Sequence, residues 1–392
     1  MIVESIIFLL YDNKKNATFV FMKNIAIIGG GSAGLFLAKQ LSKYNTINTY
    51  IFERNSKLAT KLKASGGGKA NIFNMQISPE CYNNKLFIKN LLQKFNAYHL
   101  KQEFESFGLQ MKIDEEHRVY PITEFSQTVV DVLVNNIQKN TKIIYQYNVN
   151  NIKSINQKWQ INDFETLFDI VILASGTPAG MIKANRDKYN NYLFDLKLNT
   201  SKYRPSLCGF KIKNYPKMLF GCRTKSIVHL YKDNQLLFKE KGEITFKEDG
   251  ISGIVILNAS AYYNRLKDKQ NCSIVLNLVH HDENYNVSAH LQKYNTLLGI
   301  LHPKLNELYQ KKAFNIQKFE LQIDNTYDFD YAQVCSGGIS TEEITPYFEI
   351  KKYKNLYAIG EMLDIDGICG GYNLFFAFAS AYLTAKHILN GN

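Results

Sequence analysis

Two glycine-rich segments carry the residue types and spacing that most directly indicate chemistry in this sequence. The first reads Gly29-Gly30-Gly31-Ser32-Ala33-Gly34 and fits GxGxxG, and Glu53 follows Gly34 after nineteen residues. In this pattern the glycines allow a tight turn, a close approach of the backbone to a pyrophosphate and close packing of a helix on a sheet. The helix N-terminus binds phosphate, and the acid binds a ribose diol. We therefore predict a dinucleotide site with contacts from Gly29, Gly31, Ser32, Ala33, Gly34, Glu53 and Arg54.

The second segment is KLKASGGGKANIFN at 61–74. Its three adjacent glycines have no side chains that would hold a flat ring system or a phosphate away from the backbone. Since a single loop of the first kind is enough for one pyrophosphate, the second segment needs its own explanation.

The elements around these loops are expected from the hydrophobic pattern. Residues 24–28 are typical of a buried parallel strand, 35–44 have helical periodicity, and 49–52 form a second apolar strand. Further helices are expected at 86–108 and 126–138. Short antiparallel strands are expected at 142–150, 154–162 and 164–168, and another buried strand at 168–176.

A change of pattern near residue 203 indicates a second domain. Antiparallel strands are expected at 206–212, 226–246 (with a turn at 232–234) and 272–280, and a helical stretch at 288–311. Glycines return near residue 333. We therefore expect a nucleotide-binding domain in two pieces, 22–195 and 333–392, and an inserted β-rich and helical substrate domain at 196–332. Residues 1–21 have neither the basic start nor the cleavage site of a signal peptide, and we expect a dispensable extension.

Composition limits the classes of function. The 392 residues suggest two domains, and the net charge is +12 with 47 basic residues. Either a general bias towards lysine or a polyanionic partner explains this charge. The six cysteines contain no CxxC pair, and the histidines show no metal-ligand spacing, so no metal site is expected. Scattered thiols favour a reducing, cytoplasmic location, and no apolar run is long enough to span a membrane.

The order of elements resembles the two-dinucleotide-binding-domain flavoproteins of the glutathione-reductase type. Residues Ala174-Ser175-Gly176 stand where those proteins have a turn near the cofactor, and Gly360-Glu361 resembles their GD motif, whose acid meets the ribitol. This resemblance implies that the cofactor is FAD.

Five ordered motifs resemble a narrower family, the BaiN/YhiN-type flavoproteins. The segment at 61–74 is similar to their KxxxSGGGRCNxTN, and 117–133, 242–260, 332–344 and 360–385 are similar to further family segments. The resemblance implies an α/β fold, in which a glutathione-reductase-type Rossmann-like FAD-binding domain is interrupted by an inserted β-barrel domain with a helical subdomain. It also implies that both glycine loops contact one extended cofactor. The implied further contacts are Lys61, Ser65, Gly66, Gly67, Gly68, Asn71 and Val149 along the FAD, and Gly371, Tyr372, Asn373 and Leu374 at the isoalloxazine.

The sequence departs from the family pattern at several positions. Thr177 stands where a second glycine is usual after Gly176, Lys69-Ala70 replaces Arg-Cys, and Cys335 replaces a threonine. The candidates for a proton donor or acceptor are Cys335, Tyr372, Glu361 and Cys369, and the residues alone do not choose among them.

The resemblance implies an FAD-dependent oxidoreductase that acts on a small molecule, such as an amine or an activated C=C bond. Two alternatives stay open: a flavoenzyme that reduces a uridine of large-subunit rRNA to dihydrouridine, and a flavoprotein without turnover. Lysines interleaved with aromatic rings at 210–241 favour RNA, although a half-exposed strand gives the same pattern. No second GxGxxG is present, so no dedicated NAD(P)H domain is expected, and transient electron donation by NADH or NADPH stays open.

Overall fold

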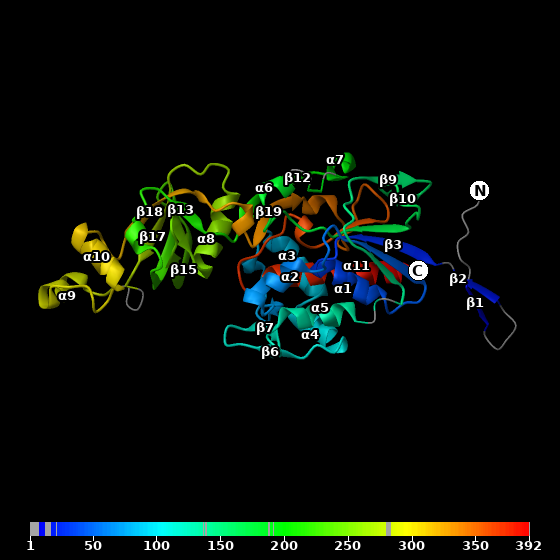
Figure 1. Ribbon diagram of the computed structural model, residues 1–392, viewed down its shortest axis with the longest axis horizontal. Coiled ribbons are helices and arrows are strands. Elements are labelled where there is room, and N and C mark those ends of the chain that lie inside the picture. Colours follow the sequence, from blue (N-terminus) through cyan, green and yellow to red (C-terminus); the bar gives the residue numbers. More distant parts are fainter. Residues whose placement is uncertain are drawn as a thin grey trace. The chain divides into compact units, whose positions relative to one another are not determined.

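The structure is a computed structural model that describes residues 8–11, 17–20, 22–135, 137, 139–186, 189–190, 192–279 and 284–391. Contacts divide the chain into two compact units (Figure 1). Unit 1 contains residues 1–177, 187–202 and 337–392, and unit 2 contains 178–186 and 203–336. The domain limits expected from the sequence stay predictions.

A five-stranded parallel sheet forms the centre of unit 1, in the order β20-β11-β3-β4-β8. Its strands are β3 (Lys23–Ile28), β4 (Ile47–Phe52), β8 (Thr141–Ile144), β11 (Ile170–Leu173) and β20 (Leu356–Ala358). The prediction of an antiparallel strand at the start of 142–150 was wrong. Here β8 pairs in parallel with the open edge of β4. A short apolar run does not indicate whether its strand will pair in the parallel or the antiparallel direction.

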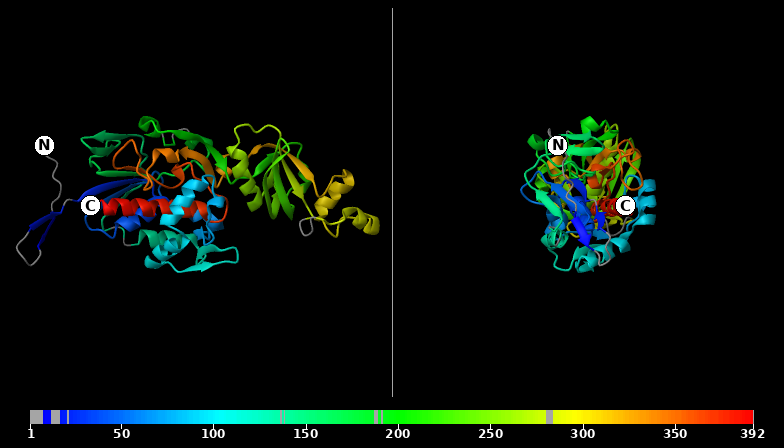
Figure 2. Two further views of the ribbon diagram at one scale, coloured as in Figure 1. Left: turned by 180° about the vertical axis from the view of Figure 1, so that it is seen from behind. Right: turned by 90° about the vertical axis from the view of Figure 1, so that its right-hand side faces the viewer.

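Helices surround this sheet. They are α1 (Ser32–Leu41), α2 (Thr60–Ala64), α3 (Lys85–Lys94), α4 (Ala97–Ser106), α5 (Ser126–Val134), α7 (Tyr192–Leu196) and α11 (Tyr372–Asn390). The stretch expected as helical at 86–108 is broken, because Phe95 is extended and the Asn96 side chain caps α4. The apolar helix α11, red in Figure 2, packs against α1.

Smaller elements complete unit 1. The short sheets contain β1 (Phe8–Tyr11) with β2 (Ala17–Val20), β9 (Ile152–Ile155) with β10 (Lys158–Ile161), and β5 (Phe73–Asn74), β7 (Arg118–Pro121) and β6 (Met111–Ile113). The 3-10 turns are η1 (Ser65–Gly68), η2 (Pro79–Cys81), η5 (Thr341–Glu343) and η6 (Gly360–Met362). Of the expected extension at 1–21, only β1 and β2 lie within the described residues.

Unit 2 contains a closed barrel in the order β13-β16-β15-β14-β17-β18. Its strands are β13 (Phe210–Ile212), β14 (Arg223–Lys232), β15 (Gln235–Phe246), β16 (Gly250–Ser252), β17 (Cys272–Asn277) and β18 (Phe319–Thr326). The predicted turn lies between β14 and β15, where Asp233 and Asn234 have positive φ, as the tight turns of β-hairpins require.

The helices of unit 2 are α6 (Lys183–Arg186), α8 (Ile254–Arg265), α9 (Val287–Tyr294) and α10 (Pro303–Lys311), and its 3-10 turns are η3 (Lys217–Leu219) and η4 (Phe329–Tyr331). Helix α8 was missed from the sequence. It packs so closely on β15 that a Cβ atom at Gly242 would lie 2.9 Å from Val255.

The chain passes between the units after residues 177 and 186, and again within β12 (Thr200–Ser206) and β19 (Val334–Ile339). The strands β12 and β19 form a two-stranded sheet. The Rossmann-type sheet, the barrel and the helices of unit 2 confirm the predicted fold class. Within the described residues, no helix has the length and apolar character needed to cross a membrane.

Candidate cofactor site

The first glycine loop connects β3 to α1, and its glycines have different roles. A Cβ atom at Gly29 would lie 2.4 Å from the carbonyl oxygen of Ala174, and one at Gly34 would lie 2.1 Å from that of Gly29. These two positions therefore require glycine for packing. Gly31 has open space, because a Cβ there would meet no atom within 4 Å. Helix α1 begins at Ser32, and the N–H groups of its first turn, including those of Ser32 and Ala33, have no intrahelical acceptors.

Glu53, at the end of β4, is held against this loop. Its Oε2 accepts a hydrogen bond from the Gly30 N–H at 2.9 Å, and its Oε1 accepts from the backbone and side chain of Asn55 at 2.8 and 2.7 Å. Only 7% of Glu53 is exposed. Gly30 and Asn55 were not among the predicted contacts, and the sequence offers no clear signal for Asn55.

The other residues expected near Glu53 lie in adjoining segments. The Arg54 guanidinium carbon lies 4.9 Å from the ring centre of Tyr189. The Tyr147 N–H donates to the Glu53 carbonyl at 3.0 Å, and the buried Val149 follows two residues later. The structure therefore brings the segment of Val149 to the end of β4.

The second glycine loop forms the turn η1. Gly66, Gly67 and Gly68 have φ of 58°, 65° and 90°, a backbone region in which side chains are rarely tolerated. A Cβ atom at Gly67 or Gly68 would meet nothing within 4 Å, so this backbone borders open space. The Ser65 hydroxyl donates to the Leu62 carbonyl at 2.7 Å and is thus occupied within the loop.

Asn71 joins this segment to the start of α11. In the amide orientation that satisfies both of its polar atoms, the side-chain oxygen accepts from the Gly371 N–H at 3.2 Å and the nitrogen donates to the Phe73 carbonyl at 3.1 Å. Gly371 has φ of 95°, and a Cβ there would lie 2.6 Å from the Phe73 carbonyl carbon. Glycine is therefore required where the two segments meet.

The residues after Gly371 are fixed by further hydrogen bonds. The Asn373 side chain accepts from the N–H of Gly367 and donates to its carbonyl, both at 2.9 Å. The carbonyl of Tyr372 accepts from the hydroxyl of Tyr82 at 2.7 Å. Leu374 lies in the first turn of α11, where N–H groups have no intrahelical acceptor. The sequence reasoning missed Tyr82.

The turn Ala174-Ser175-Gly176 follows β11 and is packed by a segment that the sequence reasoning also missed. The Ser175 hydroxyl lies 2.6 Å from the Tyr192 hydroxyl and 2.8 Å from Asn190 Oδ1, and the Tyr189 hydroxyl donates to the Ser175 carbonyl at 2.6 Å. Burial raises the pKa of Tyr192, so its hydroxyl stays protonated.

Gly360 and Glu361 bring the C-terminal segment next to the turn that follows β11. The Gly360 N–H donates to the Ser380 hydroxyl at 3.0 Å, and a Cβ at Gly360 would lie 3.1 Å from that of Ala33. Glu361 Oε2 accepts from Lys61 Nζ at 2.6 Å and from the Thr177 hydroxyl at 3.3 Å. Lys61 thus ties the second glycine loop to a residue 300 positions later.

The residues present fit an extended cofactor with phosphate and diol groups. Open backbone at Gly31, Gly67 and Gly68 gives room for a ligand, and the helix start at Ser32 suits phosphate. Glu53 and Glu361 supply carboxylates that can accept hydroxyl hydrogen bonds.

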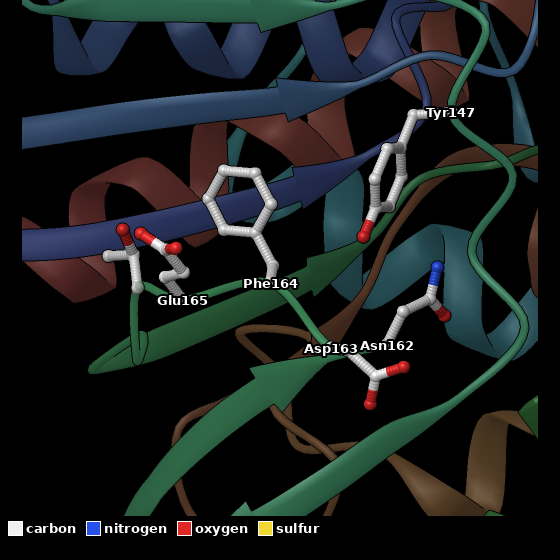
Figure 3. A pocket seen from close by; sticks show the side chains of 6 residues that line it. Tyr147, Asn162, Asp163, Phe164 and Glu165 are labelled. Atoms are coloured by element: carbon white, nitrogen blue, oxygen red, sulfur yellow. The ribbon is translucent and has the colours of Figure 1, made fainter.

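A separate hollow lies beside Tyr147 (Figure 3). Its lining contains Tyr147, Asn162, Asp163, Phe164, Glu165 and Thr166. The Phe164 ring packs edge-on against that of Phe52. None of these lining residues is a predicted cofactor contact.

In the part of the chain that the structure describes, no group of three or more His, Cys, Asp or Glu side chains could hold a metal ion, and His280 and His281 lie outside this part. All six cysteines are free thiols. Cys335 is buried in unit 2 with Cys208, whereas Cys369 is half-buried in the loop before α11.

Comparisons with known proteins give one family and several relatives. The family model described as HI0933-like protein Rossmann domain matches residues 23–387. A 3-dehydro-bile acid delta(4,6)-reductase of Clostridium scindens is 28% identical over 404 residues, which cover 93% of this chain and 98% of that protein. A ribosomal RNA dihydrouridine synthase of Haemophilus influenzae is 27% identical over 425 residues, covering 94% and 98%.

A protein of the same name from Escherichia coli is 24% identical over 404 residues, covering 93% of this chain and 97% of that protein. Among solved structures, L-proline dehydrogenase from P. horikoshii aligns with a TM-score of 0.39 and 13% identity, covering 95% of this chain and 94% of the other.

Proposed function

Because the chain belongs to the HI0933-like Rossmann family, we propose that it is an FAD-dependent reductase of a carbon–carbon double bond conjugated to a carbonyl group. One observation carries the substrate class: two relatives with different substrates are named for the same type of reaction. A 3-dehydro steroid with double bonds from C4 has an alkene conjugated to its ketone. The uracil ring likewise has its C5=C6 bond conjugated to the C4 carbonyl.

The residues of the site support FAD as the cofactor. We propose that the start of α1, at Ser32 to Gly34, binds the diphosphate and that Glu53 binds the ribose diol. Glu361 would accept a hydroxyl of the ribityl chain. Open backbone at Gly67 and Gly68 would allow the cofactor to lie against η1.

The start of α11 would complete the site. When bound and reduced by a two-electron donor such as NADH or NADPH, FAD would supply a hydride to one carbon of the double bond, and a proton would go to the other carbon. The N–H groups of the first turn, at Asn373 and Leu374, would stabilise negative charge on the ring system through hydrogen bonds and the positive end of the helix. Asn71 and Tyr82 would hold this turn in place.

A second candidate, reduction of a uridine in ribosomal RNA, is favoured by the outer surface of the barrel. Lys239 lies directly opposite His229 in the β14–β15 pair, and Lys241 lies opposite Ile227. Both lysines are exposed, and the His229 ring stacks on that of Tyr231 with centres 6.1 Å apart. Cations beside stacked rings suit phosphates and unpaired bases.

Anaerobic half-reactions test both candidates. The purified holoprotein is first mixed with NADH or NADPH, or photoreduced, and bleaching of the flavin absorbance is recorded. The reduced protein then receives a steroid dienone or a large-subunit rRNA transcript. Recovery of the oxidised spectrum together with a reduced C=C bond in the product supports the proposal, and the productive substrate distinguishes the candidates. Reoxidation by oxygen alone, with both substrates unchanged, would contradict it.

A further inference from the structure

We propose that Thr177 is a positioning residue for FAD, which fixes the carboxylate of Glu361 through a ring of hydrogen bonds that also includes Lys61. The inference depends on the proposed function only in taking FAD as the ligand of this site. Thr177 was not among the predicted contacts, and it stands where the resembling family has glycine.

The three side chains come from three segments of unit 1 that are distant in sequence. Lys61 Nζ, in α2, donates to the Thr177 hydroxyl oxygen at 3.1 Å and to Glu361 Oε2 at 2.6 Å. The Thr177 hydroxyl donates to the same Oε2 at 3.3 Å. Every pair in the ring is therefore in direct contact. The ring joins the second glycine loop, the turn after β11 and the Gly360-Glu361 motif.

The exposed fractions of the three side chains indicate which of them holds the other two in place. The side chains of Lys61 and Glu361 are 42% and 22% exposed, whereas Thr177 is 1% exposed. A half-exposed ion pair between two long side chains contributes little by itself, because solvent screens it and both chains lose rotamer freedom. A threonine is stiff at χ1 because its Cβ is branched, and burial restricts it further. Its hydroxyl therefore gives both charged groups a fixed partner.

This arrangement leaves one carboxylate oxygen available. Both contacts to Glu361 are made by Oε2, and among the described residues Oε1 has no hydrogen-bond partner. A carboxylate held by one oxygen can accept a ligand hydroxyl with the other without losing further side-chain entropy. Preorganisation of this kind increases affinity. A glycine at 177 would remove the neutral member of the ring and leave Glu361 dependent on the ion pair.

The test compares FAD affinity and apoprotein stability in Thr177→Val, Thr177→Ser and Thr177→Gly. Valine keeps the shape and removes the hydroxyl, whereas serine keeps the hydroxyl. The matched control is Thr384→Val, because Thr384 is also fully buried in unit 1 and donates to the Tyr347 carbonyl at 3.3 Å. The Kd for FAD is measured by quenching of flavin fluorescence, and the Tm of each apoprotein by circular dichroism.

We expect T177V and T177G to raise the Kd for FAD about tenfold, as the loss of a hydrogen bond to a charged group predicts. T177S should restore the Kd to within about twofold of the original, and T384V should leave it unchanged. Equal Kd values for T177V, T177S and the original protein would overturn the proposal, as would an equal weakening by T384V. If T177V does not fold, the comparison of T177S with T177G decides in the same way.

These readouts are independent of the substrate. A protein that binds FAD tightly, loses affinity in T177V and reduces no conjugated double bond would refute the proposed reaction and leave the role of Thr177 intact. If T177V binds FAD with unchanged affinity and the protein reduces a conjugated alkene, the role of Thr177 would be refuted and the proposed reaction supported.

Discussion

The hydroxyl of Tyr82 donates a hydrogen bond of 2.7 Å to the carbonyl oxygen of Tyr372, which lies 290 residues later. Two backbone contacts accompany it: Tyr82 forms an antiparallel bridge with Gly367, and the Ile368 N–H donates to the Cys81 carbonyl at 2.9 Å. Burial raises the pKa of Tyr82 well above its usual range, so the hydroxyl keeps its proton and remains a donor. These contacts fix the loop before α11 and the first residue of that helix.

Replacing Tyr82 by phenylalanine tests this connection. We expect Y82F to lower the free energy of unfolding by about 1 kcal/mol, since one buried hydrogen bond is lost. The Kd for FAD should rise as well, because the start of α11 is less well fixed. Urea unfolding and flavin titration measure the two effects. Tyr98, which is 68% exposed, provides the control Y98F. If Y82F and Y98F behave alike in both measurements, the contact has no such role.

The charge of Glu53 can be tested with Glu53→Gln. Both carboxylate oxygens accept from N–H donors, so the amide nitrogen of glutamine would have to face either the Gly30 N–H or Asn55. We expect the Kd for FAD to rise about 10- to 100-fold, since a buried hydrogen bond is lost and two donors oppose each other. The exposed Glu165 provides the control E165Q. An unchanged Kd in E53Q would show that the cofactor does not depend on this carboxylate.

Because the thiol of Cys208 is buried, we expect the free energy of unfolding to fall at alkaline pH. Burial raises the pKa of Cys208 from 9.0 to about 11. The unfolded chain therefore ionises this thiol near pH 9, while the folded chain does so only near pH 11. The stabilisation is complete below pH 9 and is lost as the pH rises through about 11. In Cys208→Ala, the free energy of unfolding should fall less steeply between these two values, as urea unfolding at several pH values would measure. Parallel curves for C208A and the original protein would contradict the assignment.

The exposed lysines of the barrel lead to a prediction about how RNA binding depends on salt concentration. If RNA is the substrate, Lys239→Ala combined with Lys241→Ala should weaken RNA binding and reduce the slope of log K against log salt by about 2. The control is Lys352→Ala with Lys354→Ala, two exposed lysines of unit 1. Fluorescence anisotropy with an rRNA fragment measures both. An equal change of slope in the two double variants would indicate general charge attraction and no specific surface.

Local patterns explain which parts of this molecule could be predicted. The glycine loop before α1 is encoded by neighbouring residues, because the tight turn, the helix start and the apolar strand lie within one stretch of chain. The left-handed backbone at Gly66 to Gly68 is likewise a local property of glycine. The family match confirms the BaiN/YhiN-type resemblance that these and the later motifs indicated.

The missed features depend on contacts between residues that are 17 to 290 positions apart and that share no local pattern. Tyr82, Tyr192 and Thr177 are ordinary residue types in their local segments, and only the fold brings them to Tyr372, Ser175 and Glu361. The parallel pairing of β8 is decided in the same way, since a short apolar strand accepts either direction and the free edge of β4 selects one.

The paired strands β12 and β19 have a consequence for how such a protein could diversify. The longer segment of unit 2, residues 203–336, begins within β12 and ends within β19, and these strands are hydrogen-bonded neighbours. The two ends of this longer segment therefore lie side by side, whereas the shorter segment of unit 2, residues 178–186, joins unit 1 separately. Evolution could therefore lengthen, shorten or replace the segment between Tyr203 and Ser336 without rerouting the residues of unit 1 on either side of it.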